Sequence, residues 1–446
     1  MFADVAEPPS ATVSGPVVGD RPPFGAPSPE VLQRAGYVCK EFEIAGQAAA
    51  YALTDDPPAG PDGRWHAVAR GWGAYRTRLL VLRPREAGSF NGTVLLNWQN
   101  VSTGAERAAP RTGEVYRGYA WVGVSAQMTG LYGLPRRRGQ PTRGLPLLDA
   151  DPQRYAGLVH PGEPGSFDIF SAAARAVCPG RAVDPDPLGG LPVQRVVALG
   201  SSQAAMRLCT YANAVHPRHR VVDGFLLSVW EGRAPRLDAP DESLSLRTAL
   251  RGDLDVPVLV VNSEFEAPAT AVLDLPDTEL RRIWEVAGAP HGTARTTARP
   301  PAGEWGPNPI SWRPVHEAAI RAMHAWLTDA RPPTVQPRIT TTRRRPSLIV
   351  RDEGGNAWGG IRLPEVAVPI AEYRGRKGGT GRAPVLGGWR PYPDDAVRSR
   401  YGTRAEYAER WSAAVDDLVG LGVVLPDDAD AMSARGEAVA ETLRLG

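Results

Sequence analysis

The chain has 446 residues, of which 42% are hydrophobic and 22% are charged, and its formal net charge is +2. This composition excludes a mainly disordered chain, and the length allows a large hydrophobic core. A charge this close to neutral gives no electrostatic case for a nucleic-acid partner. No apolar run approaches the length of a transmembrane helix, so we expect no membrane partner. Three cysteines without CxxC spacing are too few for a disulfide framework.

Residues 1–30 are rich in Pro, Gly and Ala, which predicts a flexible N-terminal arm. This stretch lacks the basic start and the apolar segment of a secretory signal, so we expect a cytoplasmic location. Nothing in the sequence indicates an oligomeric state.

Short apolar runs then recur along the chain and indicate strands. They lie at residues 75–82, 93–96, 120–124, 195–199, 222–227, 256–261 and 283–286. Most are continuous rather than alternating, as expected of strands that are covered on both faces. Helical stretches, such as 167–177 and 206–215, separate several of them. This alternation predicts an α/β fold with a mostly parallel central sheet and helices on both faces.

We expect a catalytic domain over residues 31–330, in which the Gly- and Pro-rich segment 128–166 forms a lid or a long loop. A linker at 331–346 begins a C-terminal extension, 331–446, that packs on this domain. The extension has one helix that starts at the capping box of Thr403 and Glu406, and a second at about 428–443.

The most informative motif is a Gly-x-Ser-x-Ala turn that begins at Gly200 and centres on Ser202. An apolar strand precedes it and a helical stretch follows, as in a nucleophile elbow that lifts a serine hydroxyl above the sheet edge. The alternative is a helix entry capped by a serine.

The residues that follow favour the nucleophile. The strand 256–261 leads into Glu264 and Glu266, and the strand 283–286 leads into a loop that carries His291. Nucleophile, acid and histidine in this order, each just after a strand, is the chain order of α/β-hydrolases. A histidine takes the serine proton and a carboxylate orients the histidine. We predict Glu266 as the acid, with Glu264 as the alternative. His216 and His219 fall in a stretch that we expect to be exposed to solvent.

An oxyanion hole needs two N–H donors. The first is predicted to be the backbone N–H of Gln203, directly after the nucleophile, and the second to come from Gln99 or Asn100, after the strand 93–96. Candidate substrate-binding side chains complete the predicted site: Trp98, Tyr132, Ser201, Trp230 and Phe265. No metal-ligand spacing, dinucleotide fingerprint or P-loop occurs, so we expect no metal and no cofactor.

Several stretches together resemble the bacterial α/β-hydrolase-domain family of esterase-like proteins, over about residues 60–440. They are the elbow and residues 97–101, 117–127, 151–155, 167–170, 284–288 and 355–362. The resemblance implies an α/β-hydrolase fold with Ser202 and His291 in the nucleophile and base positions, and it implies that 347–446 belongs to the same module. The chain departs from the family at Asn97, where Glu is more frequent, and at Glu266, where Asp is frequent.

These features predict a serine hydrolase that cleaves a small-molecule carboxylic ester through an acyl-enzyme. An acyltransferase or cyclising enzyme that uses the same acyl-enzyme is an alternative, because acceptor choice depends on the shape of the pocket. A non-catalytic binding protein on a hydrolase fold is another alternative, because fold does not determine function.

Overall fold

The computed structural model describes residues 9–54, 59–134, 144–238, 245–294, 299–301, 303–342, 347–377 and 383–445. The chain divides into two compact units, Met1–Val258 and Leu259–Gly446. The division falls inside the range predicted for the catalytic domain, whose bounds stay a prediction. Part of the predicted lid, residues 135–143, lies outside the described residues.

The first unit contains most of the sheet. Its elements are β1 (Thr12–Ser14), α1 (Pro29–Ala35), β2 (Tyr37–Leu53), β3 (Ala67–Pro84), β4 (Thr93–Trp98), β5 (Ala120–Val124), α2 (Met128–Tyr132), α3 (Leu147–Ala150), α4 (Ser166–Val177), β6 (Arg195–Ser201), α5 (Gln203–Thr210), α6 (His216–His219), β7 (Gly224–Ser228), β8 (Arg233–Ala234) and β9 (Leu246–Arg247).

The sheet strands of this unit follow the order β1-β2-β3-β5-β4-β6-β7. The strand β4 pairs in parallel with both β5 and β6, and β6 pairs in parallel with β7. Every residue of β5 and of β7 is buried. The parallel arrangement that the continuous apolar runs predict is therefore confirmed.

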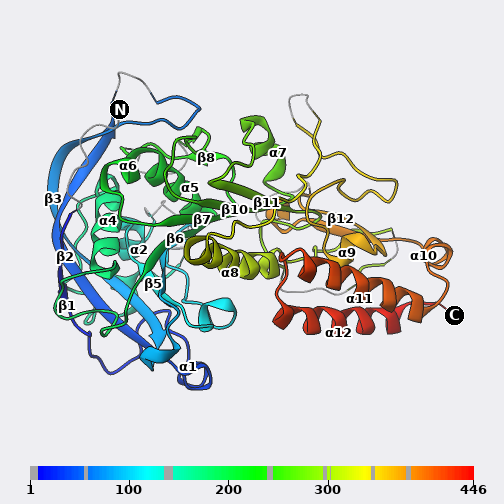
Figure 1. The fold of residues 1–446 in the computed structure, drawn as a ribbon, viewed down its shortest axis with the longest axis horizontal. Coiled ribbons are helices and arrows are strands. Elements are labelled where there is room, and N and C mark those ends of the chain that lie inside the picture. Colours follow the sequence, from blue (N-terminus) through cyan, green and yellow to red (C-terminus); the bar gives the residue numbers. More distant parts are fainter. Residues whose placement is uncertain are drawn as a thin grey trace, which may run out of the picture. The chain divides into compact units, whose positions relative to one another are not determined.

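The antiparallel part of the sheet is a long hairpin, β2 and β3, which curves along one side of the first unit (Figure 1). Within the segment predicted as an arm, Thr12–Ser14 forms β1 and pairs with β2. The described part of the predicted lid carries a small apolar cluster of Leu131, Leu147, Tyr155 and Leu158.

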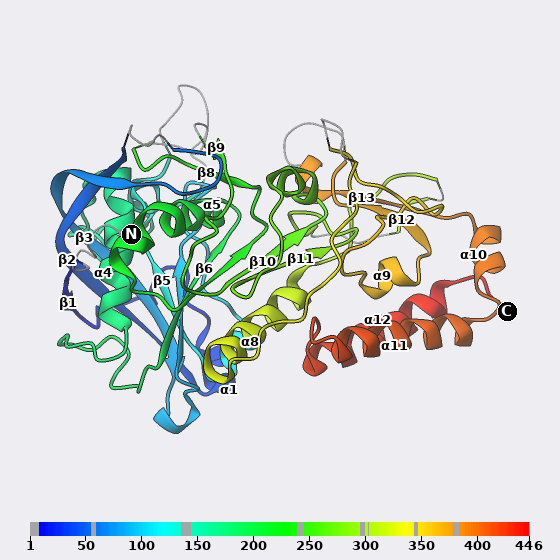
Figure 2. The ribbon, with the colours of Figure 1, turned by 45° about the horizontal axis from the view of Figure 1, so that its top comes forward.

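The helix α5 follows β6 (Figure 2). It begins at Gln203, one residue after Ser202. Its α-helical part ends at Thr210, and a π-helical turn, Tyr211–Val215, continues it. The predicted stretch 206–215 is therefore helical throughout, but the helix begins three residues earlier and its last turn is wider than an α-helix.

The second unit supplies the remaining elements: β10 (Val258–Ser263), α7 (Ala267–Thr270), β11 (Arg281–Val286), α8 (Arg313–Asp329), α9 (Pro364–Ala367), β12 (Ala371–Arg374), β13 (Gly388–Pro391), α10 (Asp394–Arg400), α11 (Arg404–Gly420) and α12 (Pro426–Thr442). The strands β10 and β11 are neighbours in a sheet, and β12 pairs antiparallel with β13.

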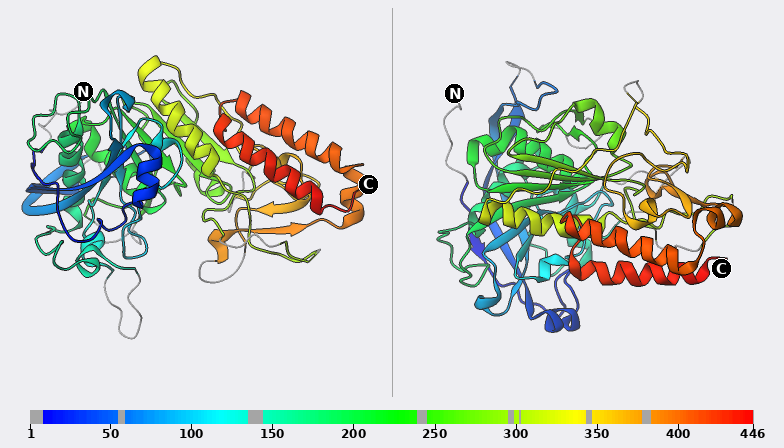
Figure 3. Two further views of the ribbon diagram at one scale, coloured as in Figure 1. Left: turned by 90° about the horizontal axis from the view of Figure 1, so that it is seen from below. Right: turned by 45° about the vertical axis from the view of Figure 1, so that its right-hand side comes forward.

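The two C-terminal helices, α11 and α12, lie side by side (Figure 3). The Thr403 hydroxyl accepts a hydrogen bond of 3.1 Å from the Glu406 N–H, so the predicted helix start is confirmed. Tyr407, Trp411 and Val415 on α11 pack with Ala440 and Leu443. Among the described residues, no helix combines the length and the apolar character that crossing a membrane requires.

Candidate active site

Ser202 occupies a strained turn between β6 and α5. Its backbone angles are φ 58° and ψ −119°, in a region that residues other than glycine rarely adopt. Such a conformation costs about 1 to 3 kcal/mol and persists only where the surroundings hold it. Here the Ser202 N–H donates to the Ser228 carbonyl at 2.9 Å, and the Ser202 carbonyl accepts from Met206 N–H at 3.1 Å. The turn is thus held between the end of β7 and the first turn of α5.

Gly200 makes this turn sterically possible. A Cβ at this position would lie 2.8 Å from both the Ala204 carbonyl oxygen and the Leu208 Cδ1 atom. Contacts this short force neighbouring atoms to move, and the backbone of α5 cannot move without displacing the turn. The motif therefore has a steric reason, because the strand and the helix approach each other too closely for a side chain at 200.

The loop after β4 is tied to the same turn by two hydrogen bonds. The Asn100 side-chain amide donates to the Ser201 carbonyl at 2.8 Å. The Val101 N–H donates to the Gln203 side-chain oxygen at 3.2 Å. The backbone N–H of Gln203 belongs to the first turn of α5, whose N–H groups have no acceptor within the helix. Of the predicted oxyanion residues, Asn100 and Gln203 thus adjoin the turn at Ser202.

Gln99 and Asn100, the two alternatives for the second oxyanion donor, differ in the hydrogen bonding of their backbone N–H groups. The Gln99 N–H donates to the Val124 carbonyl at 3.3 Å, and its buried side-chain amide nitrogen has no partner among the described residues. No described residue accepts a hydrogen bond from the Asn100 N–H. Of the two backbone N–H groups, that of Asn100 is therefore the one without an acceptor among the described residues.

Gln127 is a residue of this region that the sequence reasoning missed. Its side-chain oxygen accepts one hydrogen bond from the Trp98 indole at 2.9 Å and another from the Gln203 side-chain amide at 2.8 Å. It is 2% exposed. The sequence feature that could have identified Gln127 is its position just after β5, at the carboxyl end of a parallel strand. The other predicted site residues also follow strand ends. Gln127 therefore holds the side chain of Gln203, the residue after Ser202.

In the second unit, a buried carboxylate holds the imidazole of His291. The Glu266 Oε1 atom lies 2.5 Å from His291 Nδ1, and Glu266 has no exposed surface. Its other oxygen, Oε2, accepts from the Ser263 N–H at 2.9 Å and from the Ser263 hydroxyl at 2.6 Å. A carboxylate bonded in this way orients the ring and favours a proton on Nδ1. The structure therefore pairs His291 with Glu266.

Glu264, the alternative acid, makes other contacts. Its Oε1 accepts from the Arg351 guanidinium at 2.7 Å and from Gly375 N–H at 3.1 Å. Its Oε2 accepts from Gly288 N–H at 2.8 Å, and Glu264 N–H donates to the Ala289 carbonyl. This carboxylate fastens the loop that leads to His291.

Asn308 and residues of the predicted C-terminal extension complete the support of the histidine loop. The buried Asn308 amide donates to the carbonyls of Gly288 at 2.7 Å and Arg374 at 2.9 Å. Gly292 N–H donates to the Val385 carbonyl at 2.8 Å. The segment around β12 and β13 therefore positions the loop that carries His291.

The predicted substrate-binding residues fall into two groups. Trp98 and Trp230 have no exposed surface: Trp98 packs against Phe167 and Phe170, and the Trp230 indole donates to the Arg233 carbonyl. Both are core residues in this structure, because neither ring is exposed. Tyr132, Ser201 and Phe265 keep some exposure. The Phe265 ring meets His291 edge-on, with the centroids 5.5 Å apart.

The expectation that His216 and His219 face solvent is wrong, because both are buried. His219 Nδ1 lies 2.7 Å from the Ser171 hydroxyl, and its Nε2 lies 3.1 Å from the Tyr51 hydroxyl, which donates to Asp168. Burial and then the charge of Arg218 lower the pKa of His219 to about 4. This serine–histidine pair is buried and forms part of the core.

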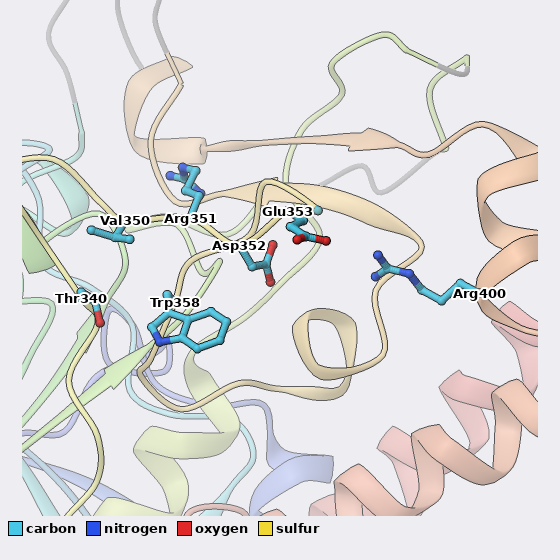
Figure 4. Close-up of a pocket in the computed structure, with 8 residues that line it drawn as sticks. Thr340, Val350, Arg351, Asp352, Glu353, Trp358 and Arg400 are labelled. Carbon is cyan, nitrogen blue, oxygen red and sulfur yellow. The ribbon is translucent and has the colours of Figure 1, made fainter.

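A pocket of about 670 Å³ opens in the second unit (Figure 4). It is lined by Thr340, Val350, Arg351, Asp352, Glu353, Gly354, Trp358 and Arg400. None of these is a residue that the sequence predicts for the site. Among the described residues, no group of three His, Cys, Asp or Glu side chains could hold a metal ion.

Comparison with known proteins gives one match that spans nearly the whole chain. The sequence model of a family described as "Alpha/beta hydrolase domain" matches residues 6–434. No curated protein matches the sequence significantly.

Several solved structures are distantly similar to the chain. A prolyl endopeptidase is 13% identical, with 56% of this chain and 35% of that chain covered and a TM-score of 0.28. A brefeldin A esterase, a bacterial homologue of human hormone-sensitive lipase, is 14% identical, with 54% and 68% covered and a TM-score of 0.26. A fungal esterase from Rhizomucor miehei is 13% identical, with 60% and 83% covered and a TM-score of 0.28. The chain thus spans about a third of the length of the endopeptidase.

Proposed function

The chain belongs to the alpha/beta hydrolase domain family, and from this premise we propose that it is a serine hydrolase that cleaves a carboxylic ester. Ser202 is the nucleophile, His291 the general base and Glu266 the acid. The observation that carries the proposal is the 2.5 Å contact between His291 Nδ1 and the buried Glu266 carboxylate. Because Glu266 engages Nδ1, the role of proton acceptor falls to Nε2.

The proposed reaction follows from these roles. Ser202 Oγ attacks the ester carbonyl while its proton passes to His291 Nε2, and the oxyanion binds to the N–H groups of Gln203 and Asn100. His291 then returns the proton to the leaving alcohol, and the acyl group stays on Ser202. A water molecule, activated by the same imidazole, releases the acid. The strained backbone at Ser202 supports this role, because strain at a non-glycine residue recurs at catalytic turns.

A covalent probe tests the proposal. A fluorophosphonate is expected to label the wild type and to leave Ser202→Ala unlabelled, while Ser201→Ala, which keeps the nucleophile, is still labelled. Short-chain p-nitrophenyl esters are expected to be hydrolysed, with a loss on the order of 10⁶-fold in Ser202→Ala. Labelling should also fall in His291→Ala, because the hydroxyl loses its base.

Two results would reject the proposal. Labelling that persists in Ser202→Ala would move the nucleophile elsewhere, and a wild type that neither reacts with the probe nor hydrolyses esters would point to a binding protein. Adding amine acceptors and analysing the products separates hydrolysis from acyl transfer.

A further inference from the structure

The guanidinium of Arg376 and the imidazole of His291, the proposed catalytic base, contact the same aromatic ring, that of Phe265. The Arg376 guanidinium stands over the Phe265 ring, 5.2 Å from its centroid. The same ring meets the His291 imidazole edge-on at a centroid distance of 5.5 Å. Phe265 thus connects an exposed arginine with the imidazole through two ring contacts.

The backbone next to Arg376 is held firmly. Gly375 N–H donates to the Glu264 carboxylate at 3.1 Å. A Cβ at position 375 would lie 2.5 Å from the Ala289 carbonyl oxygen and 2.9 Å from the Phe265 nitrogen. The residue before Arg376 is therefore packed against both loops of the acid–base pair. Arg376 is fixed beside the site by its backbone, although its side chain is exposed.

The surroundings of Arg376 carry an excess of positive charge. Arg374 and Arg390 share one carboxylate, that of Glu372. Arg376 and Lys377 form no ion pair with any of the described residues. Lys377 instead stands 6.0 Å from the centroid of the Trp305 ring, against which Arg374 also lies. Among the described residues, no anion therefore neutralises these two cations.

We propose that Arg376 binds a carboxylate on the alcohol portion of the ester substrate. This inference rests on the proposed function. A guanidinium fits a carboxylate through two parallel N–H···O bonds, and unpaired cations at a site raise the local concentration of anions. The alcohol portion is the part concerned, because the proposed base, His291, delivers its proton to the leaving oxygen. Arg376 is thus a residue that determines specificity.

A pair of esters that differ in one charge tests this inference. The acetate ester of 4-hydroxybenzoate carries a carboxylate on the leaving phenol, and the acetate ester of methyl 4-hydroxybenzoate is neutral. We expect Arg376→Gln to lower the ratio of their kcat/KM values, anionic over neutral, by about tenfold. Arg376→Lys should keep most of the ratio, and Arg376→Glu should reverse the preference. Comparing ratios between variants cancels the different reactivities of the two phenols.

Arg410→Gln is the matched control, since Arg410 is an exposed arginine of the second unit on α11, where it pairs with Glu406. We expect this variant to keep the wild-type ratio. In the wild type, 0.5 M NaCl should lower the ratio, because salt screens exposed charges.

A second measurement does not depend on turnover. The product 4-hydroxybenzoate should protect the wild type from the fluorophosphonate better than its methyl ester does, and Arg376→Gln should lose this difference. A wild type that is labelled at Ser202 but shows the same ratio and the same protection as Arg376→Gln would overturn the inference and leave the proposed function intact. A wild type that is not labelled at Ser202 would reject the proposed function itself.

Discussion

Replacing Glu266 by its neutral isostere should remove catalysis with little loss of stability. In Glu266→Gln the side-chain oxygen stays on the Ser263 N–H and hydroxyl, which donate to Oε2 at 2.9 and 2.6 Å. The amide NH₂ then faces His291 Nδ1, in place of the oxygen that lies 2.5 Å away. An NH₂ group can only donate, so Nδ1 becomes the acceptor and the ring proton moves to Nε2. The imidazole then cannot take a proton from Ser202.

The expected loss in kcat is about 10⁴-fold, which corresponds to about 5.5 kcal/mol of activation free energy. The free energy of unfolding should fall by less than about 1.5 kcal/mol, because all three hydrogen bonds remain, and their loss of charge is offset by the smaller cost of burying a neutral amide. Hydrolysis of a short-chain p-nitrophenyl ester measures kcat, and thermal unfolding followed by circular dichroism measures stability.

Glu264→Gln is the matched comparison. Both Glu264 oxygens accept hydrogen bonds, from Arg351 and Gly375 on one and from Gly288 on the other, so either amide orientation sets NH₂ against a donor. Breaking a buried ion pair costs about 3 to 5 kcal/mol. The lower value applies because the Arg351 side chain is 23% exposed. At about 2 to 4 °C per kcal/mol for a unit of this size, Tm should fall by roughly 6 to 12 °C.

The comparison refutes the reasoning if Glu266→Gln keeps more than about a tenth of the wild-type kcat. The reasoning is also refuted if Glu264→Gln loses as much kcat as Glu266→Gln while the Tm of Glu264→Gln is unchanged. Glu264 would then be the acid.

Two further predictions concern the first unit. Gly200→Ala should lower the free energy of unfolding by about 1 to 3 kcal/mol and reduce kcat, because the added Cβ meets α5. Gly71→Ala is the control and should do neither, because no atom lies within 4 Å of a Cβ at that position. Equal urea midpoints for the two variants would contradict this prediction. The pKa of His219 in the folded protein, about 4, lies below its ordinary value of 6.5. As the pH drops, the unfolded chain therefore binds this proton before the folded chain does. The free energy of unfolding should then fall by up to about 3 kcal/mol between pH 6.5 and pH 4. Urea unfolding at pH 7 and 4.5 should show a smaller fall in His219→Gln, and an unchanged fall would exclude His219 as the cause.

The sequence alone was sufficient for the features that depend on local pattern. The continuous apolar runs predicted β4, β5, β6 and β7 and their parallel pairing, because a strand covered on both faces needs apolar side chains at every position. The Gly-x-Ser-x-Ala motif predicted the tight turn at Ser202, because only small residues at 200 and 204 allow the strand and the helix to approach. These predictions involve residues close together in the chain.

Only the tertiary structure decided which side chains meet. Glu264 and Glu266 follow the same strand, two residues apart, so local sequence could not separate them. Their partners are distant: Glu266 contacts a residue 25 positions away, and Glu264 contacts Arg351, 87 positions away. The burial of Trp98 and His219 was likewise invisible in the sequence, because it depends on helices and strands that pack on them from elsewhere in the chain. Side-chain partners are a property of packing, and packing is determined by the whole fold.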